Sequence, residues 1–277
     1  MRYQVIFNAD DYGRDDDVSR GIREAHTNGI VTSTTAMMNM PASAANLRQA
    51  ALETPGLGLG VHLVLTSGKP LLPAESVSSL VDEHGFFLRP DALIAQLDSL
   101  KPGEVMAEWR AQIQKFIQIT GHAPTHLDSH HHASYYNEML FRSMLMLAKE
   151  VGCAIRILGT STQEEDNGLS PRLRSSYAGF SDSLLAEFQP STPDDFNATF
   201  YDDRATKSNL LGILQNLKEG VTEIMCHPGY AGAELISASI YNHQRESELE
   251  ILTDPDVKQE VESRGIRLSS FADLAVE

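Results

Sequence analysis

Short runs of apolar residues alternate along this chain with longer segments whose apolar residues recur at helical spacing. This alternation is typical of βα units whose strands pair in parallel within one sheet. We expect seven strands, with ends placed to within about two to four residues. They span residues 4–8, 32–39, 58–65, 125–128, 154–158, 222–226 and 266–269.

The clearest helix is expected between the third and fourth strands. Met106, Trp109, Ile113 and Phe116 form one apolar stripe, and Gly121 follows as a helix stop. By contrast, residues 66–102 and 159–193 show no sustained period and contain several Pro, Gly and Ser. We therefore expect both segments to be long loops between strand and helix, of the kind that shape substrate sites.

No repeat of fixed period interrupts this pattern, so we expect residues 1–277 to form one domain. The predicted fold is α/β, a distorted or incomplete (β/α) barrel. Chains of about 250 residues commonly form one such barrel.

Composition narrows the function classes. The formal charge of −16 argues against a nucleic-acid partner, because binding phosphates requires a basic surface. We expect no membrane partner, because no apolar stretch approaches the roughly 18 residues of a membrane-spanning helix. Two cysteines and no signal-like segment after Met1 favour the cytoplasm. A homodimer is compatible with the sequence.

Acidic and imidazole side chains gather where predicted strands end. In parallel α/β folds the active site forms at this edge of the sheet, so these residues are expected to converge on one cleft. They are Asp10, Asp11, His62, the segment from His126 to His132, and His227.

Each of these groups also has a structural interpretation. Asp10 and Asp11 could cap a helix or stabilise a turn. His62 lies in an apolar strand, where a buried histidine bonded to its surroundings is common. His227 precedes Pro228 and could be a turn residue.

The histidine-rich segment cannot place all its rings on one ion if it is extended. His126 and His130 would then lie about 13 Å apart at ~3.3 Å per residue. Either the chain turns at Asp128 and Ser129, or one histidine is a ligand and the others support it or contact substrate.

An aspartate with two histidines leaves coordination positions open for water and substrate. Such mixed donors suit zinc, iron or manganese better than calcium. We expect metal-assisted hydrolysis, with Asp10 as the base that takes a proton from water and His227 as the acid that protonates a leaving amine.

These motifs resemble those of the YdjC-like carbohydrate deacetylases, over residues 3 to about 270. The segments that carry the resemblance begin at Asn8, Gly29, His62, Thr125 and Met225. The resemblance implies a barrel-like fold of the glycoside hydrolase and deacetylase kind, with a bound divalent cation. It also implies that the protein removes an acetyl group from an N-acetylglucosamine unit of a short chitin oligosaccharide, such as the disaccharide or its 6-phosphate.

Carried over by position, the resemblance makes Asp10 the catalytic base and makes Asp11, His62 and His130 the metal ligands. It leaves His126 and Asp128 in supporting positions. Family members are usually described with magnesium, whereas two imidazoles favour zinc or a neighbouring ion, so the identity of the ion stays open.

Other polar residues are candidate supporting or substrate-contacting groups: His131, Arg156 and Arg174. After His132 the chain departs from the family pattern, which commonly has another His two residues on and a Pro near the next helix. Here it reads Ala133-Ser134-Tyr135-Tyr136-Asn137, and we expect this change to alter sugar contacts and to leave the metal site undisturbed.

Two other function classes remain open. They are a metal-dependent phosphoesterase and a non-catalytic sugar-binding protein with a structural metal. A glycosidase fits less well, because it needs paired carboxylic acids and no metal.

Overall fold

The computed structural model describes residues 2–159 and 168–274, and within them eight strands form one parallel sheet. The strand order is β5-β4-β3-β2-β1-β7-β6, and β8 pairs separately with β1. The strands are β1 (Tyr3–Tyr12), β2 (Ser33–Ala36), β3 (Gly58–Leu63), β4 (His126–Ser129), β5 (Ala154–Ile155), β6 (Asp195–Asn197), β7 (Gly220–Cys226) and β8 (Arg267–Leu268).

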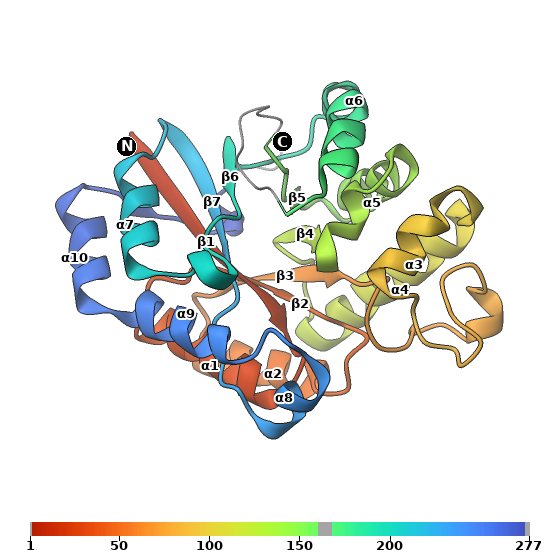
Figure 1. Ribbon diagram of the computed structural model, residues 1–277, viewed down its shortest axis with the longest axis horizontal. Helices are drawn as coiled ribbons and strands as arrows, with labels where there is room; N and C mark the ends of the chain where they lie inside the picture. Colours follow the sequence, from red (N-terminus) through yellow and green to blue (C-terminus); the bar gives the residue numbers. More distant parts are fainter. Residues whose placement is uncertain (1, 160–167, 275–277) are drawn as a thin grey trace.

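The seven strands of the main path curl into a half-barrel, which confirms the predicted incomplete barrel (Figure 1). All seven predicted strands overlap observed ones, although the segment 154–158 contributes only the two residues of β5. Strand β6 was not predicted. It has three residues, of which only Phe196 is buried, so it lacks both the length and the apolar pattern that reveal a strand.

Helices cover the outside of the curled sheet (Figure 1). Neighbouring helices contact one another in the sequence α6, α5, α4, α2, α1, α9, α10, α7. Their bounds are α1 (Asp16–Thr27), α2 (Ser43–Glu53), α3 (Pro90–Ala95), α4 (Pro102–Thr120), α5 (Glu138–Val151), α6 (Pro171–Phe188), α7 (Lys207–Gln215), α8 (Ala233–Ala238), α9 (His243–Thr253) and α10 (Pro255–Ser263).

Helix α4 confirms the clearest helical prediction. Trp109 and Phe116 are fully buried, and the helix ends at Gly121, whose φ of 80° lies in the left-handed region. The segment 66–102 is largely irregular, as expected, and contains the short helix α3.

The expectation of a continuous loop over residues 159–193 was wrong where helix α6 forms. Ser170 caps this helix by accepting from the backbone N–H of Leu173, and Pro171 occupies its first turn. The helix buries only Leu173, Tyr177, Ser181 and Leu184, so its apolar pattern is sparse. Residues 160–167 lie outside the described part of the chain.

The interior of the half-barrel is polar near the carboxyl ends of the strands. Because side chains alternate along a strand, every second residue of each strand faces this interior. Entirely buried polar residues of the strands include Asn8, Thr35, His126, Asp128 and Glu223, and Arg156, which directly follows β5, is also entirely buried. The core thus includes a layer of charged and hydrogen-bonding groups directly beneath the rim.

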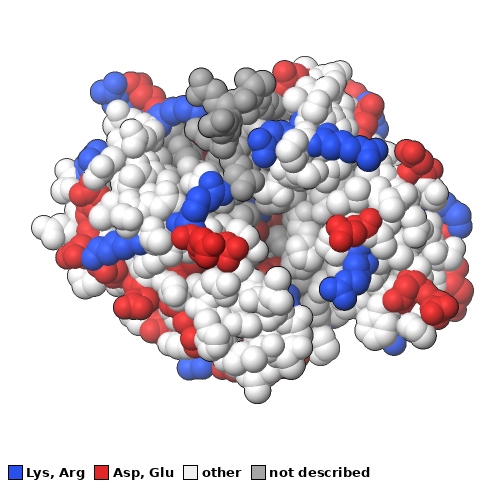
Figure 2. Space-filling view, viewed as in Figure 1, with Lys and Arg blue, Asp and Glu red and all other residues white. Residues whose placement is uncertain are grey.

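Acidic and basic side chains are interspersed on the face shown in Figure 2, so the net negative charge is not concentrated there in one patch. Among the described residues, no helix combines the length and apolar character that crossing a membrane requires.

Candidate active site

Asp10 and Asp11 both reach one cavity because strand β1 is irregular at its carboxyl end. Its pairing with β2 shifts register between Ala9 and Tyr12, and Asp11 has a φ of 72°. In a regular strand, consecutive side chains would point to opposite faces. Here both carboxylates line a cavity of about 410 Å³.

The helix that follows does not use these carboxylates as its cap. Asp15 caps α1, with its Oδ1 accepting from the N–H of Val18 at 2.8 Å. Gly13 makes the tight connection, since its φ is 78° and a Cβ there would lie 2.7 Å from Cα of Ser43. The capping interpretation of Asp10 and Asp11 is therefore wrong.

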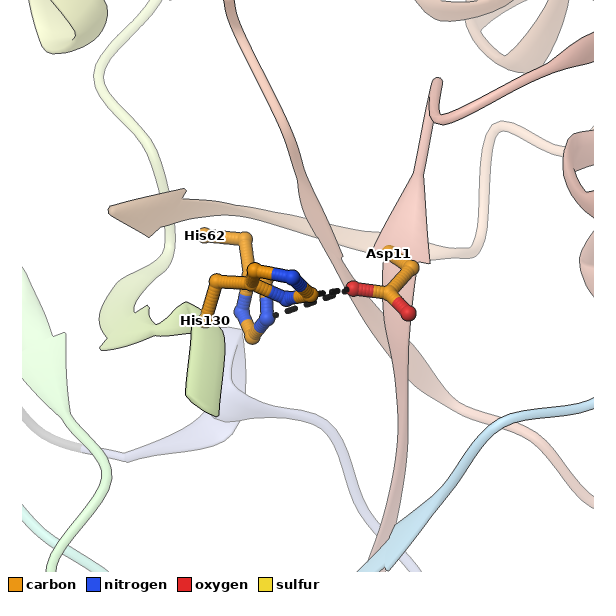
Figure 3. Close-up of side chains that lie close together, drawn as sticks. All are labelled: Asp11, His62 and His130. Carbon is orange, nitrogen blue, oxygen red and sulfur yellow. Dashed lines mark ion pairs between the residues drawn. The ribbon is translucent and has the colours of Figure 1, made fainter. Parts of the chain in front are cut away.

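Asp11, His62 and His130 converge at the rim from β1, β3 and the turn after β4 (Figure 3). Oδ1 of Asp11 lies 3.0 Å from Nδ1 of His130 and 3.5 Å from Nε2 of His62. All three side chains are buried, and one ligand atom from each lies within 4.8 Å of the others.

This trio fits a divalent cation. Oδ1 of Asp11 is buried and receives no hydrogen bond from any residue that the structure describes, despite its two imidazole neighbours. Ligands about 2.1 Å from one ion, at angles of roughly 90–110°, lie about 3.0–3.4 Å apart, close to the observed spacing. Two imidazoles with one carboxylate are typical ligands of zinc, iron and manganese.

Asp128 orients His62. Its Oδ1 lies 2.6 Å from Nδ1 of His62, which turns Nε2 toward Asp11. Burial lowers the pKa of His62, but the charges of Asp128 and Asp10 outweigh it and raise this pKa to about 9. A carboxylate behind a ligating histidine is a common arrangement at metal sites.

Asp10 is held by a guanidinium instead of joining the trio. Nη1 and Nη2 of Arg156 donate to its two oxygens at 2.8 and 2.7 Å, and Asn8 donates to Oδ1 at 3.0 Å. Burial alone would raise the pKa of Asp10, but Arg156 holds this pKa well below its usual range. Asp10 is thus a fixed, ionised carboxylate at neutral pH.

Arg156 joins three carboxylates inside the half-barrel. In addition to its hydrogen bonds with Asp10, Arg156 interacts with two further carboxylates. Its Nη1 lies 3.0 Å from Oδ2 of Asp128, and its Nε donates to Oε1 of Glu223 at 2.8 Å. Burial raises the pKa of Glu223 to about 8 even though Arg156 opposes it. One guanidinium thus serves two of the predicted site residues.

The histidine rings of residues 126–132 lie at different depths below the rim of the half-barrel. The chain stays extended through Ser129 and turns only at His131 and His132, whose φ values are 54° and 57°. His130, His131 and His132 line the cavity. His126 lies deeper, stacked on Phe271 at 3.6 Å between ring centroids, so it does not join the trio.

His126 instead supports Asp10 indirectly. Its Nε2 lies 3.1 Å from Oδ1 of Asn8, the residue that donates to Asp10. A Cβ at position 60 would lie 2.6 Å from the His126 ring, so Gly60 provides the space for this histidine.

His227 stands across from Asp10, with its Nε2 3.9 Å from Oδ2 of that carboxylate. Its backbone N–H donates to Glu248 at 2.5 Å, which fixes the residue at the end of β7. Burial lowers the pKa of His227 to about 4, although Asp10 opposes the shift. The imidazole is therefore neutral near pH 7 and placed to exchange a proton beside Asp10.

Several residues that line the cavity were not predicted, among them Arg245, Tyr201 and Tyr241. Arg245, from α9, pairs with Oδ2 of Asp11 at 2.5 Å, and Tyr201 and Tyr241 lie against His227. These residues are brought in by contacts distant in sequence, and no local pattern marks them. Glu223 did carry a signal, because it is a charged residue within an otherwise uncharged strand.

Arg174 lies on α6, where its Nη2 donates to the carbonyl of Leu169. It is absent from the described residues that line the cavity, so its contact with substrate stays a prediction.

The chain is similar over nearly its whole length to a known protein family. Residues 4–263 match the family model described as YdjC-like protein. A carbohydrate deacetylase of Thermoanaerobacter pseudethanolicus is 36% identical over 99% of this chain and 100% of its own length. A chitooligosaccharide deacetylase of Salmonella heidelberg is 34% identical over 99% of this chain and 100% of its own.

A solved structure shares the whole fold. It is an Enterococcus faecalis protein described as a cellobiose-phosphate cleavage protein. It superposes with a TM-score of 0.85 and 35% identity, over 98% of each chain.

Proposed function

This chain belongs to the YdjC-like protein family, and from that premise and its site we propose that it is a metal-dependent carbohydrate N-deacetylase. The observation that carries the proposal is that one cavity holds three side chains of the types that bind metals, Asp11, His62 and His130. The same cavity also holds Asp10 and His227, which are not part of this trio. A structural metal site would be closed and would not need these two further groups.

The substrate we propose is a short chitin oligosaccharide, with the N-acetylated disaccharide or its 6-phosphate as the first choices. The relatives named as carbohydrate and chitooligosaccharide deacetylases support this choice. Arg14 also lines the cavity and has no ion pair with the described residues, so it could meet a phosphate.

The reaction adds water across an amide: oxygen goes to the acetyl carbon, a proton goes to nitrogen, and acetate and a free amine result. Asp11, Nε2 of His62 and Nδ1 of His130 would hold the divalent cation. When bound, the cation polarises the acetyl carbonyl and makes water more acidic. Zinc, iron or manganese suits the two imidazoles better than magnesium.

Asp10 takes the proton from water. It is ionised at neutral pH, and Arg156 fixes both of its oxygens, so its direction toward the cavity is set before substrate arrives. A base positioned in this way contributes roughly 10²–10⁴-fold to a hydrolysis rate.

His227 delivers a proton to the departing nitrogen. Because the free imidazole is neutral near pH 7, it must first gain a proton. It takes the proton that Asp10 accepted from water, and this transfer returns Asp10 to its carboxylate form, which stabilises the imidazolium beside it. Its Nε2 faces the same cavity as the base, so the proton enters and leaves within one site.

A two-metal phosphoesterase is less compatible with the geometry. Among the described residues, the second acidic and imidazole group is Asp10, His62 and Asp128, which shares His62 with the trio. The guanidinium of Arg156 already pairs with both carboxylates of this second group. One cation beside a guanidinium is therefore the favoured arrangement.

The deciding assay measures acetate released from N-acetylglucosamine and its di- and trisaccharides, with and without 6-phosphate, under several divalent metals. We expect release that requires metal. Orthophosphate as the product would select a phosphoesterase, and tight sugar binding without acetate would select a sugar-binding protein.

We also place the enzyme in the cytoplasm, in keeping with its two free, buried cysteines.

A further inference from the structure

Two tyrosines and the predicted acid form an aromatic wall on one side of the cavity. The rings of Tyr201 and Tyr241 stack with centroids 4.5 Å apart and planes 11° apart. The ring of His227 meets both of them edge on, at 5.2 Å from Tyr201 and 5.7 Å from Tyr241. All three residues line the cavity that holds Asp10 and Asp11.

Glu248 fixes this wall to the reacting centre. The hydroxyl of Tyr241 donates to one oxygen of this buried carboxylate, and the backbone N–H of His227 donates to the other. The Tyr241 hydroxyl also accepts from the N–H of Asp202, the residue after Tyr201. Tyr201, Tyr241 and His227 therefore keep their relative positions through a shared set of hydrogen bonds.

Tyr201 is the ring of the wall that a ligand can cover. Tyr241 is only 8% exposed, whereas 37% of Tyr201 is exposed although Tyr241 covers one of its faces. The Tyr201 hydroxyl forms no hydrogen bond with residues 2–159 or 168–274. Scattered exposed aromatics are ordinary on protein surfaces, but this one lines the cavity of the catalytic candidates.

We propose that Tyr201, backed by Tyr241, is the platform on which a pyranose ring of the substrate stacks. This inference rests on the proposed deacetylase function and extends it to a sugar-binding position. One face of a pyranose carries mostly C–H groups, which pack well on an aromatic ring. Large, rigid aromatic surfaces contribute strongly to ligand contacts.

The location matches the geometry of an acetamido sugar. The nitrogen to be protonated is bonded directly to a ring carbon, so the ring must lie next to the proton donor. Tyr201 contacts His227, the residue proposed to protonate that nitrogen. A ring stacked on Tyr201 therefore lies beside His227, with its amide near Asp10.

The test compares Tyr201→Ala, Tyr201→Leu and Tyr201→Phe in acetate release from the N-acetylated disaccharide. We expect KM to rise about tenfold for Ala and Leu, with kcat changed less, because uniform binding is lost. Phe should keep KM within about twofold, since the aromatic face remains. Leu keeps apolar volume, so it separates stacking from collapse of the cavity wall.

Phe86→Ala is the matched control, because Phe86 is an exposed aromatic, 46% accessible, that is not among the cavity-lining residues described. An unchanged KM for Tyr201→Ala would overturn the platform. So would an equal rise for Phe and Ala, since a hydroxyl contact would then explain the effect.

Calorimetry separates failure of the platform from failure of the proposed function. Binding of the disaccharide is measured on the metal-loaded wild type and on Tyr201→Ala. If the wild type releases no acetate from any sugar, the deacetylase proposal fails. The platform then stands only if binding weakens about tenfold in Tyr201→Ala, and it falls if the affinities are equal or the sugar does not bind.

Discussion

His62 and Asp128 are register partners on the adjacent strands β3 and β4, and Nδ1 of His62 lies 2.6 Å from Oδ1 of Asp128. The sheet itself therefore sets which nitrogen of His62 faces Asp11. A metal ligand whose orientation comes from strand register needs no loop to move into place when the ion binds.

Replacing Asp128 with Asn should weaken metal binding by about 10–100-fold, because His62 loses the carboxylate that orients its ring. Calorimetric titration of metal into the stripped protein measures the change. Asp82→Asn is a matched control, since Asp82 is an exposed aspartate that caps a turn and is not among the described residues that line the cavity. Equal metal affinity in Asp128→Asn and wild type would contradict the orienting role.

Asp10→Asn should retain metal while kcat falls by about 10²-fold or more, because the amide cannot accept the proton of water. Metal content by elemental analysis and acetate release on the same sample check both halves. Turnover at the wild-type rate would show that another group is the base, and loss of metal would make Asp10 a ligand.

Chelation should abolish acetate release, and adding back zinc, manganese or magnesium should restore it to different extents. His130→Ala should lower metal affinity by roughly two orders of magnitude or more, since one of three protein ligands is removed. His122→Ala, at an exposed histidine outside the cavity, controls for loss of an imidazole. Full activity in a verified metal-free sample would refute the metal-dependent mechanism.

Metal affinity should fall as pH falls. The neighbouring carboxylates raise the pKa of His62 to about 9, whereas a ligating imidazole must be neutral. Below that pH each bound ion displaces one proton from His62, so the apparent affinity should drop about tenfold per pH unit. Titrations at pH 6 and pH 7, in buffers of different ionisation enthalpy, measure both the slope and the proton. A pH-independent affinity would contradict this account.

Arg156→Lys should lower kcat by about tenfold or more, because an ammonium cannot hold both oxygens of Asp10. The free energy of unfolding should fall by on the order of 1–3 kcal/mol, since buried hydrogen bonds to Asp10, Asp128 and Glu223 are lost. Denaturant unfolding with activity on the same variant measures both effects.

Arg110→Lys is the control for this substitution. Arg110 also makes two bonds to one carboxylate, that of Glu150, but at the surface, where the pair contributes less than about 1 kcal/mol. Similar losses in both variants would mean that burial of Arg156 is irrelevant.

The sequence by itself determined the βα pattern, and with it the half-barrel and the edge where the site lies. The period of apolar residues is a local property of the chain, so it can be recognised without knowing which distant residues are in contact. The same logic placed Asp10, Asp11, His62 and His130 at strand ends. The apolar pattern did not predict helix α6 or strand β6. Helix α6 buries few apolar residues, and strand β6 has only three residues.

The family resemblance had already assigned Asp10 and Asp11 different roles, but only the tertiary structure decided which contacts each of them makes. The irregularity of β1 at Asp11 turns two consecutive carboxylates into one cavity, with Asp11 beside the imidazoles and Asp10 on Arg156. Tyr201 and Arg245 join from segments some 190 and 234 residues beyond Asp11. Strand pairing and helix packing create such contacts between distant positions, and no local pattern in the chain encodes them.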